Sequence, residues 1–434
     1  MYIFGDDPVG REFAEALAER ARAGVQVYVV YDWFGSVGAG PLWKLLVAAG
    51  AQVRSFNSLR FDSPLGWLTR DHRKTIVVDG QVAFVSGLCA SARWNGDPGR
   101  GLEPWRDTGV EIRGPAVAEI EHAFVQVWLA SGGAAPAAEL LTLAAAIKPH
   151  GDMRIRVIAG APSATGTYRL DLAIASFARR HLWLTDAYFV GTAAYVQALA
   201  AAARDGVDVR LMVPGASDIP ALTPLSRAGY RPLLQAGVRV FEWNGTMLHA
   251  KSAVADGFWT RIGSTNLNIA SWMGNYELDV AIEDATFAAA MAAQFESDLK
   301  RTTEIVLTRR NRVRPVVGEE RPRGARRAMA GSAGRAAAGA ASVGSALGAA
   351  LTGRRVLDAA ESGLLAKMGG AILALSIVAA IWPHFVAWPA AVLGTWLGVA
   401  WLVKAFALRR VAQPSPPPAP EGKGAATRDS DAPG

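Results

Sequence analysis

The sequence predicts an α/β fold of two homologous domains related by a pseudo-two-fold axis and followed by a C-terminal hydrophobic hairpin. Two observations predict the domains: strand patterns alternate with helical patterns over residues 1–308, and one nine-residue pattern occurs twice there. The hairpin is predicted because residues 368–403 contain no Asp, Glu, Lys or Arg. With 434 residues, 51% of them hydrophobic, the chain can bury a large core, which excludes a wholly disordered protein.

The repeated pattern is His-x-Lys-x4-Asp-Gly, found as His72–Gly80 and again as His249–Gly257. Composition predicts about 0.005 chance occurrences of its first eight positions, so the pair indicates a duplication. The surroundings repeat as well, because Ala21–Val27 matches Ala203–Val209, each with a helix end, a Gly and a strand. We therefore expect two domains of similar fold.

These domains, residues 1–150 and 151–308, differ at their start. In the second, a strand–helix–strand pattern over Arg154–Leu184 precedes Tyr188-Phe-Val-Gly. The first begins with Met1-Tyr-Ile-Phe-Gly, which aligns with that later point, so about 30 residues have no counterpart. Either the true start lies upstream of Met1, or the first domain lacks its first strand–helix unit.

Charge separates the body from the tail. Residues 1–308 hold 28 Lys and Arg against 31 Asp and Glu, whereas residues 309–434 hold 17 against 7. A slightly acidic body does not favour a large groove for nucleic acid, so no nucleic-acid partner is expected. Residues 309–366, rich in Arg, Gly and Ala, predict a basic linker, and the Pro-rich residues 409–434 predict a disordered tail.

Residues 367–408 predict a transmembrane or re-entrant hairpin. A single helix through the charge-free run would be about 54 Å long, well beyond the ~30 Å of bilayer hydrocarbon. Pro383 and Pro389 divide the run into two apolar arms, each short for a full span. A buried helical pair of a soluble protein is the further alternative. Lys and Arg flank both ends, so the positive-inside tendency places the body on the cytoplasmic side.

Cys89 is the single cysteine, which forbids an internal disulfide and a structural zinc cluster. A reducing, cytosol-facing body is the natural interpretation. We expect Cys89 to be a small buried hydrophobic residue, with a redox-sensitive thiol as the alternative.

Each repeated motif places a His and a Lys two positions apart on a strand, where both side chains share a face. The Asp-Gly pair that ends each motif is a signal for a two-residue hairpin loop. Each Asp therefore lies at a turn, where it is expected to fix the hairpin and to pair locally with a cation. The six candidate catalytic residues are His72, Lys74, Asp79, His249, Lys251 and Asp256.

A two-residue loop would pair position 249 with 264 and position 72 with 87. Ser264 would then face His249, with Asn266 just beyond it. At the first motif the corresponding residues are Gly87 and Cys89, which offer no hydroxyl or amide.

A second acidic position follows each hairpin, Asp107 after the first and Glu277 after the second. Each is a candidate to accept a hydrogen bond from an imidazole and to set its tautomer. The candidate substrate-binding or supporting residues are Ser264, Asn266, Asp107 and Glu277.

Two His and two Lys brought together by a pseudo-two-fold axis suit phosphodiester transfer without a metal or cofactor. One imidazole would attack phosphorus and form a phosphohistidine. The other would protonate the departing alkoxide and later deprotonate the incoming alcohol or water. The lysines would neutralise the non-bridging oxygens.

The paired motifs, with Gly263-Ser-Thr-Asn266 and Glu277, resemble the phospholipase D superfamily. Tyr2–Gly10 and Trp105–Thr108 look like the bacterial cardiolipin synthases of that superfamily. The resemblance covers residues 1–308 and implies two phospholipase D-type α/β sandwich domains.

The resemblance also implies an activity and a location. It implies transfer of a phosphatidyl group to an alcohol such as phosphatidylglycerol, at the bacterial inner membrane, with His72 as nucleophile and His249 as acid and base. The alternatives are a phospholipase D that uses water, a nuclease, which the charge disfavours, and a decayed membrane scaffold. These synthases usually carry Gly-Gly-x-Asn after the first motif, where this chain has Ser86-Gly-Leu-Cys89.

Overall fold

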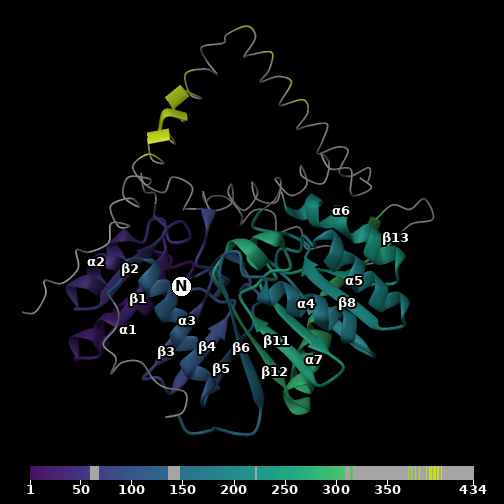
Figure 1. Ribbon diagram of the computed structural model, residues 1–434, viewed down its shortest axis with the longest axis horizontal. Coiled ribbons are helices and arrows are strands. Elements are labelled where there is room, and N and C mark those ends of the chain that lie inside the picture. The colour runs from purple at the N-terminus through teal and green to yellow at the C-terminus, as the bar shows by residue number, and fades with distance from the viewer. Residues whose placement is uncertain are drawn as a thin grey trace, which may run out of the picture. The chain divides into compact units, whose positions relative to one another are not determined.

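The computed structural model describes residues 1–58, 68–134, 147–219, 222–307 and 313–315, with single positions between 370 and 402. The chain divides into two compact units, Met1–Leu59 with Leu65–Leu375 and Arg60–Pro64 with Ser376–Gly434. All helices and strands named below belong to the first unit (Figure 1).

Most of the predicted linker, hairpin and tail lies outside the described residues. Within the linker, Val313–Pro315 is described and forms a strand that pairs with residues 305–307, so the expectation of a linker without structure is wrong for these three residues. The positions described between 370 and 402 are helical. Within the part of the chain that the structure describes, no helix has both the length and the apolar character needed to cross a membrane.

The first half forms two small sheets. Its elements are α1 (Pro8–Arg22), β1 (Tyr28–Asp32), α2 (Gly40–Ala48), β2 (Gln52–Phe56), β3 (Thr75–Val78), β4 (Val82–Ser86), β5 (Gly109–Arg113) and α3 (Ala116–Ala130). Strands β1 and β2 pair in parallel, whereas β3, β4 and β5 form an antiparallel sheet in that order.

The second half forms one nine-stranded sheet of order β14-β13-β9-β8-β7-β10-β11-β12-β6. Strands β7, β8 and β9 are parallel, and the other neighbours are antiparallel. Its elements are β6 (Arg154–Gly160), α4 (Gly166–Phe177), β7 (His181–Thr185), α5 (Ala193–Arg204), β8 (Asp208–Pro214), α6 (Leu222–Gln235), β9 (Arg239–Trp243), β10 (Ser252–Ala255), β11 (Trp259–Gly263), a π-helical turn (Ala270–Gly274), β12 (Glu277–Glu283), α7 (Ala285–Leu299), β13 (Thr302–Leu307) and β14 (Val313–Pro315).

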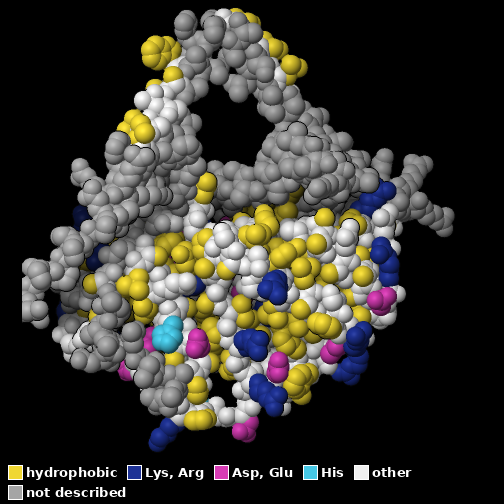
Figure 2. Space-filling view, viewed as in Figure 1, with side chains coloured by type: hydrophobic (Ala, Val, Ile, Leu, Met, Phe, Trp, Pro, Cys, Tyr) yellow, Lys and Arg dark blue, Asp and Glu magenta, His cyan; other side chains and the backbone are white. Residues whose placement is uncertain are grey.

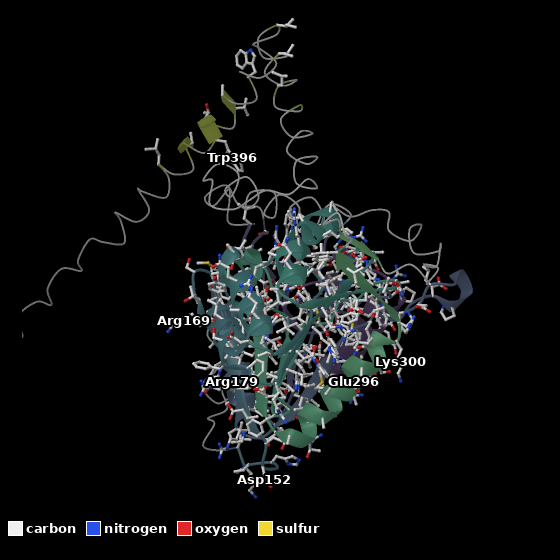
Figure 3. The ribbon with its side chains drawn as sticks, turned by 90° about the vertical axis from the view of Figure 1, so that its right-hand side faces the viewer. Asp152, Arg169, Arg179, Glu296, Lys300 and Trp396 are labelled. Atoms are coloured by element: carbon white, nitrogen blue, oxygen red, sulfur yellow. The ribbon has the colours of Figure 1, made fainter. Side chains whose placement is uncertain are left out.

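Helices cover the nine-stranded sheet on both faces. Along β7, Leu182 and Leu184 pack in the cluster that α4, α5 and α6 complete, whereas Trp183 packs with Phe295 of α7. Side chains alternate along a strand, so α7 lies on the face opposite the other three helices. Figure 3 shows Arg169 of α4 and Glu296 of α7 on opposite sides of the unit.

The three-stranded sheet packs face to face with the end of the large sheet. Val85 of β4 and Ile112 of β5 share one buried cluster with Ile262 of β11 and Val280 of β12. The two halves therefore share a core, and this core fixes β3 and β10 relative to each other.

Strand pairing repeats between the halves, with one difference. The parallel pair β1-β2 matches β8-β9, and β3-β4-β5 matches β10-β11-β12. In the second half β7 lies between β8 and β10 and joins these two groups into one sheet. In the first half, no described strand pairs with both β1 and β3, and the two groups stay separate sheets. Ile76 and Val78 are 40% and 46% exposed, whereas their counterparts Ala253 and Ala255 lie in the buried cluster beside α4. The strand–helix unit without a counterpart in the sequence is thus also unmatched here.

The Asp-Gly pair of the second motif forms a mirror-image turn, but the strands that it joins are offset by one residue. Asp256 and Gly257 have φ of 54° and 70°, and the Phe258 N–H donates to the Ala255 carbonyl. The ladder then pairs Ala255 with Trp259, so Phe258 is an extra residue that forms a bulge. The predicted two-residue register is therefore wrong by one position.

The first hairpin folds in the same way. Asp79 and Gly80 have φ of 52° and 61°, the Gln81 N–H donates to the Val78 carbonyl, and Val78 pairs with Val82. Its predicted register is wrong for the same reason, since an Asp-Gly pair specifies the turn but not the bulge that follows it.

Candidate active site

Each motif histidine lies just before a strand, beside a backbone segment of the other half. The His72 N–H donates to the Tyr276 carbonyl at 2.9 Å, and the His249 N–H donates to the Arg106 carbonyl at 2.7 Å. These contacts align each histidine with the acidic residue that follows the hairpin of the opposite half. Both side chains are buried, with 6% and 4% exposed.

His72 pairs with Glu277. Its Nδ1 lies 2.9 Å from Glu277 Oε2, and the Ser264 hydroxyl donates to the same oxygen at 2.5 Å. Because a carboxylate only accepts, we assign the proton to Nδ1, which leaves Nε2 with a free lone pair. Burial raises the pKa of Glu277, but His72 and Lys74 outweigh it and the pKa is lowered, so the carboxylate stays charged.

His249 pairs with Asp107. Its Nδ1 lies 2.7 Å from Asp107 Oδ2, and the Trp94 indole N–H donates to that oxygen at 2.7 Å. The Thr108 backbone N–H donates to Oδ1 at 2.8 Å. Burial opposes the charge on Asp107, yet His249, Lys251 and the hydrogen bond from Trp94 lower its pKa to about 2. We again assign the proton to His249 Nδ1, which donates it to the carboxylate, so Nε2 has a free lone pair.

Each histidine pairs with the acidic residue of the other half of the chain. The acidic position after the first hairpin supports the second motif, and the acidic position after the second hairpin supports the first. The sequence predicted both acids as imidazole partners but did not predict this pairing across the halves. It also placed Ser264 opposite His249, which is wrong: because the register is shifted, Ser264 contacts Glu277 and so belongs to the His72 side.

The motif lysines lie within the same buried site, with 2% and 1% exposed. Lys74 Nζ donates to the His72 carbonyl at 2.5 Å, and Lys251 Nζ donates to the His249 carbonyl and lies 3.0 Å from His249 Nδ1. Burial and the charge of Lys74 lower the pKa of Lys251 to about 8, although Asp107 opposes this. The charge of Lys251 also lowers the pKa of His72, and the charge of Lys74 lowers the pKa of His249, so both motifs share one positively charged site.

Both histidines are neutral at neutral pH. Burial lowers the pKa of His72 in spite of Glu277, and it lowers the pKa of His249 to about 3 together with the charge of Lys251. Neutral imidazoles with free Nε2 atoms can act as nucleophile or base.

Two tyrosines that sequence reasoning did not select line the motifs. Tyr2 contacts the His72 ring edge-on at 4.8 Å between centroids, and Tyr188 contacts the His249 ring edge-on at 5.8 Å. Lys74 Nζ lies 4.9 Å from the Tyr2 ring centroid. The matched segments Tyr-Ile-Phe-Gly and Tyr-Phe-Val-Gly were the signal that could have identified them.

Two buried or partly buried arginines join the halves beside the motifs. Arg73 donates to the carbonyls of Glu277 at 3.0 Å and Gly160 at 2.7 Å. Arg106 donates through Nε to the Asp298 carboxylate at 3.0 Å. Arg73 and Arg106 are each adjacent in sequence to a candidate site residue, but nothing in the sequence indicated that either would bind a residue of the other half.

The two turn aspartates are not part of this cluster. Asp256 lies at the end of β10 that is remote from His249, and its carboxylate accepts backbone N–H groups of Arg179, Arg180 and His181 at 2.9, 2.8 and 3.1 Å. Asp256 thus lies at the hairpin turn, as expected, but its carboxylate accepts hydrogen bonds from backbone amides and not from the expected cationic side chain. Asp79 occupies the same turn position with positive φ.

The remaining predicted positions are buried around the motifs. The Asn266 amide donates to Ser271 Oγ at 3.3 Å, and its Oδ1 has no hydrogen-bond partner within the described residues. Cys89 is buried, and burial raises the pKa of its thiol. A Cβ at Gly87 would lie 2.1 Å from Asp107 Oδ1, so a larger residue there would displace the carboxylate that contacts His249. Among the residues that the structure describes, no group of three or more His, Cys, Asp or Glu could hold a metal ion.

Comparisons with known proteins show what this chain is similar to. The family described as "Cardiolipin synthase, PLD-like domain" matches residues 172–299. The chain is 31% identical to the cardiolipin synthase of Halalkalibacterium halodurans over 70% of this chain, and 32% identical to cardiolipin synthase A of Pseudomonas aeruginosa over 72%. It spans 61% and 64% of the lengths of these relatives.

The fold has a match among solved structures. The phosphatidylserine synthase of Haemophilus influenzae superimposes with a TM-score of 0.55 at 14% identity, covering 70% of this chain and 81% of that one. Residues 172–299 thus match the PLD-like domain of cardiolipin synthases, and the chain as a whole is similar to bacterial cardiolipin synthases.

Proposed function

We propose that the chain is a phosphatidyltransferase of the cardiolipin synthase type, which moves a phosphatidyl group through a phosphohistidine to an alcohol such as phosphatidylglycerol. The observation that supports this best is that each histidine contacts an acidic residue of the other half, His72 with Glu277 and His249 with Asp107, beside two buried lysines. Each histidine is thereby oriented with Nε2 free, as two-step transfer requires.

In the first step His72 Nε2 attacks phosphorus. A phosphorus–nitrogen bond forms, the bond from phosphorus to the leaving oxygen breaks, and that oxygen takes a proton from His249 Nε2. The bound phosphodiester supplies the negative charge that favours protonated His249, whose pKa is low in the free protein. Glu277 balances the positive charge that develops on His72.

In the second step an acceptor alcohol gives its proton to His249, and its oxygen attacks phosphorus. The phosphorus–nitrogen bond breaks and His72 is released. If both lipids are phosphatidylglycerol, the products are cardiolipin and glycerol. Lys74 and Lys251 face the non-bridging oxygens in both steps and neutralise them.

The domain organisation is part of this proposal. Residues 1–150 and 151–308 are two homologous phospholipase D-like domains around a pseudo-two-fold axis. The matching strand pairings support it. Two parallel backbone bridges, Asp71 with Tyr276 and Arg106 with Leu248, support it too, because each includes the residue just before a motif histidine.

We also propose that residues 367–408 attach the enzyme to the cytoplasmic face of a bacterial inner membrane. Ile377 and Ile381 are helical, spaced by four residues and at least half exposed, so both offer apolar side chains to lipid. On the face shown in Figure 2, Lys and Arg lie among acidic and apolar side chains, and this mixture favours phospholipid over nucleic acid as the partner.

The test supplies full-length protein in membranes with labelled phosphatidylglycerol and identifies the products by mass. Cardiolipin with glycerol is the expected result. Phosphatidic acid alone would assign water as the acceptor and make the chain a hydrolase. No turnover by the wild type would contradict both activities.

A further inference from the structure

The two carboxylates of the site are held by different donors. Ser264 Oγ donates to Glu277 Oε2, the oxygen that faces His72. At the other pair, the donor to the oxygen that faces His249 is the Trp94 indole N–H. The two sides of the site thus have the same hydrogen-bond pattern, built from a hydroxyl on one side and an indole on the other.

Local geometry explains why a serine does not serve both sides. Gly87 repeats Ser264 in the duplication, since both lie 15 residues after their motif histidine. A Cβ at Gly87 would lie 2.1 Å from Asp107 Oδ1, so a hydroxyl-bearing side chain there would displace the carboxylate that it would have to support. The donor comes instead from Trp94, seven residues further along the chain.

Trp94 also restrains the imidazole itself. Its ring contacts His249 edge-on, with 5.2 Å between centroids and an angle of 89°. Trp105 backs this contact, with its ring 4.8 Å from Trp94 and 5.6 Å from His249. Trp94 is only 8% exposed, so its N–H depends on Asp107 rather than on bulk water.

From these contacts we infer that Trp94 is the positioning residue of the His249 side, which fixes Asp107 and His249 as Ser264 fixes Glu277 and His72. Trp94 touches no reacting atom and acts through Asp107. The inference rests on the proposed function, in which His249 transfers protons. It predicts that loss of the indole N–H impairs the proton-transfer steps and leaves nucleophilic attack intact.

A substrate with an activated leaving group separates the two effects. Phosphatidyl-p-nitrophenol releases p-nitrophenolate, which needs no proton, so the first step becomes independent of His249. Transfer from the phosphohistidine to phosphatidylglycerol still needs His249 as base. A rapid burst of p-nitrophenolate reports the first step, and the steady-state rate reports the second.

The experiment compares full-length Trp94→Phe, Ser264→Ala and Trp183→Phe. We expect Trp94→Phe to keep the burst rate within about 3-fold of wild type and to lose about 10- to 100-fold in the steady-state rate, as for a hydrogen bond to a charged group. Ser264→Ala is expected to slow the burst itself. Trp183→Phe is the matched control, because its indole also donates to an aspartate, Asp208 at 3.1 Å, away from the site.

Trp94→His, which keeps a ring N–H, is expected to recover at least part of the steady-state rate, and thermal melting shows whether each variant is folded. A Trp94→Phe protein that matches Trp183→Phe in both phases would overturn the inference. Equal losses in burst and steady state would overturn it too, since they indicate general damage. A wild type without burst or transfer would contradict the proposed function instead.

Discussion

Replacing Glu277 with Gln removes the negative charge that faces His72 and keeps the side-chain shape. The carboxylate is fully buried, and Oε2 lies 2.9 Å from His72 Nδ1. The lost charge matters most when His72 becomes positive on bonding to phosphorus. At an effective dielectric constant of about 20, unit charges about 3–4 Å apart interact by about 4–6 kcal/mol. We therefore expect about a 10³- to 10⁴-fold lower rate of phosphohistidine formation.

The p-nitrophenolate burst measures this rate directly. Glu283→Gln is the matched control, because it makes the same change at the exposed end of the same strand and is expected to stay within about 2-fold of wild type. A Glu277→Gln protein with an unchanged melting temperature and a burst within 10-fold of wild type would refute the electrostatic role of Glu277.

Three further predictions follow from the same contacts. Lys251→Met should lower the rate of phosphatidyl transfer by at least about 100-fold, with little change in the melting temperature of the protein without substrate. Transfer by the variant at a rate comparable to wild type would contradict the role of Lys251 at the non-bridging oxygens. Since burial lowers the pKa of His249 to about 3, the unfolded chain binds more protons below pH 6.5. The free energy of unfolding, measured by urea unfolding, should therefore fall as pH drops from about 6.5 towards 3, and it should fall less steeply in His249→Gln. Asp256→Asn should destabilise the fold by about 1 kcal/mol, because its carboxylate accepts three backbone N–H groups, while the burst rate stays near wild type. A large loss of burst rate in a folded Asp256→Asn protein would place Asp256 in the chemistry after all.

Much of the site follows from local sequence. The spacing of His and Lys identified both motifs, although both residues lie just before the strands β3 and β10, which begin at Thr75 and Ser252. The Asp-Gly pairs identified both turns, because few residues accept the positive φ that a mirror-image turn requires. These features depend on a few neighbouring residues, so the sequence displays them directly.

Contacts between the halves could not be predicted in the same way. His72 and Glu277 are 205 residues apart, and His249 and Asp107 are 142 apart, so only the shared core brings them together. The bulge at Phe258 shifted Ser264 by one position and changed its partner. The role of Trp94 depends on the crowded position of Gly87, which is visible only in three dimensions.

The central claim is that His72 carries the phosphatidyl group. The most direct measurement is mass analysis, under alkaline conditions that preserve phosphohistidine, of peptides from His249→Asn protein quenched after reaction with phosphatidyl-p-nitrophenol. We predict that the adduct accumulates on the peptide containing His72 and is absent from a His72→Asn, His249→Asn double variant. Transfer by the wild type without any adduct on His72, or an adduct on the wild-type peptide containing His249, would contradict the account.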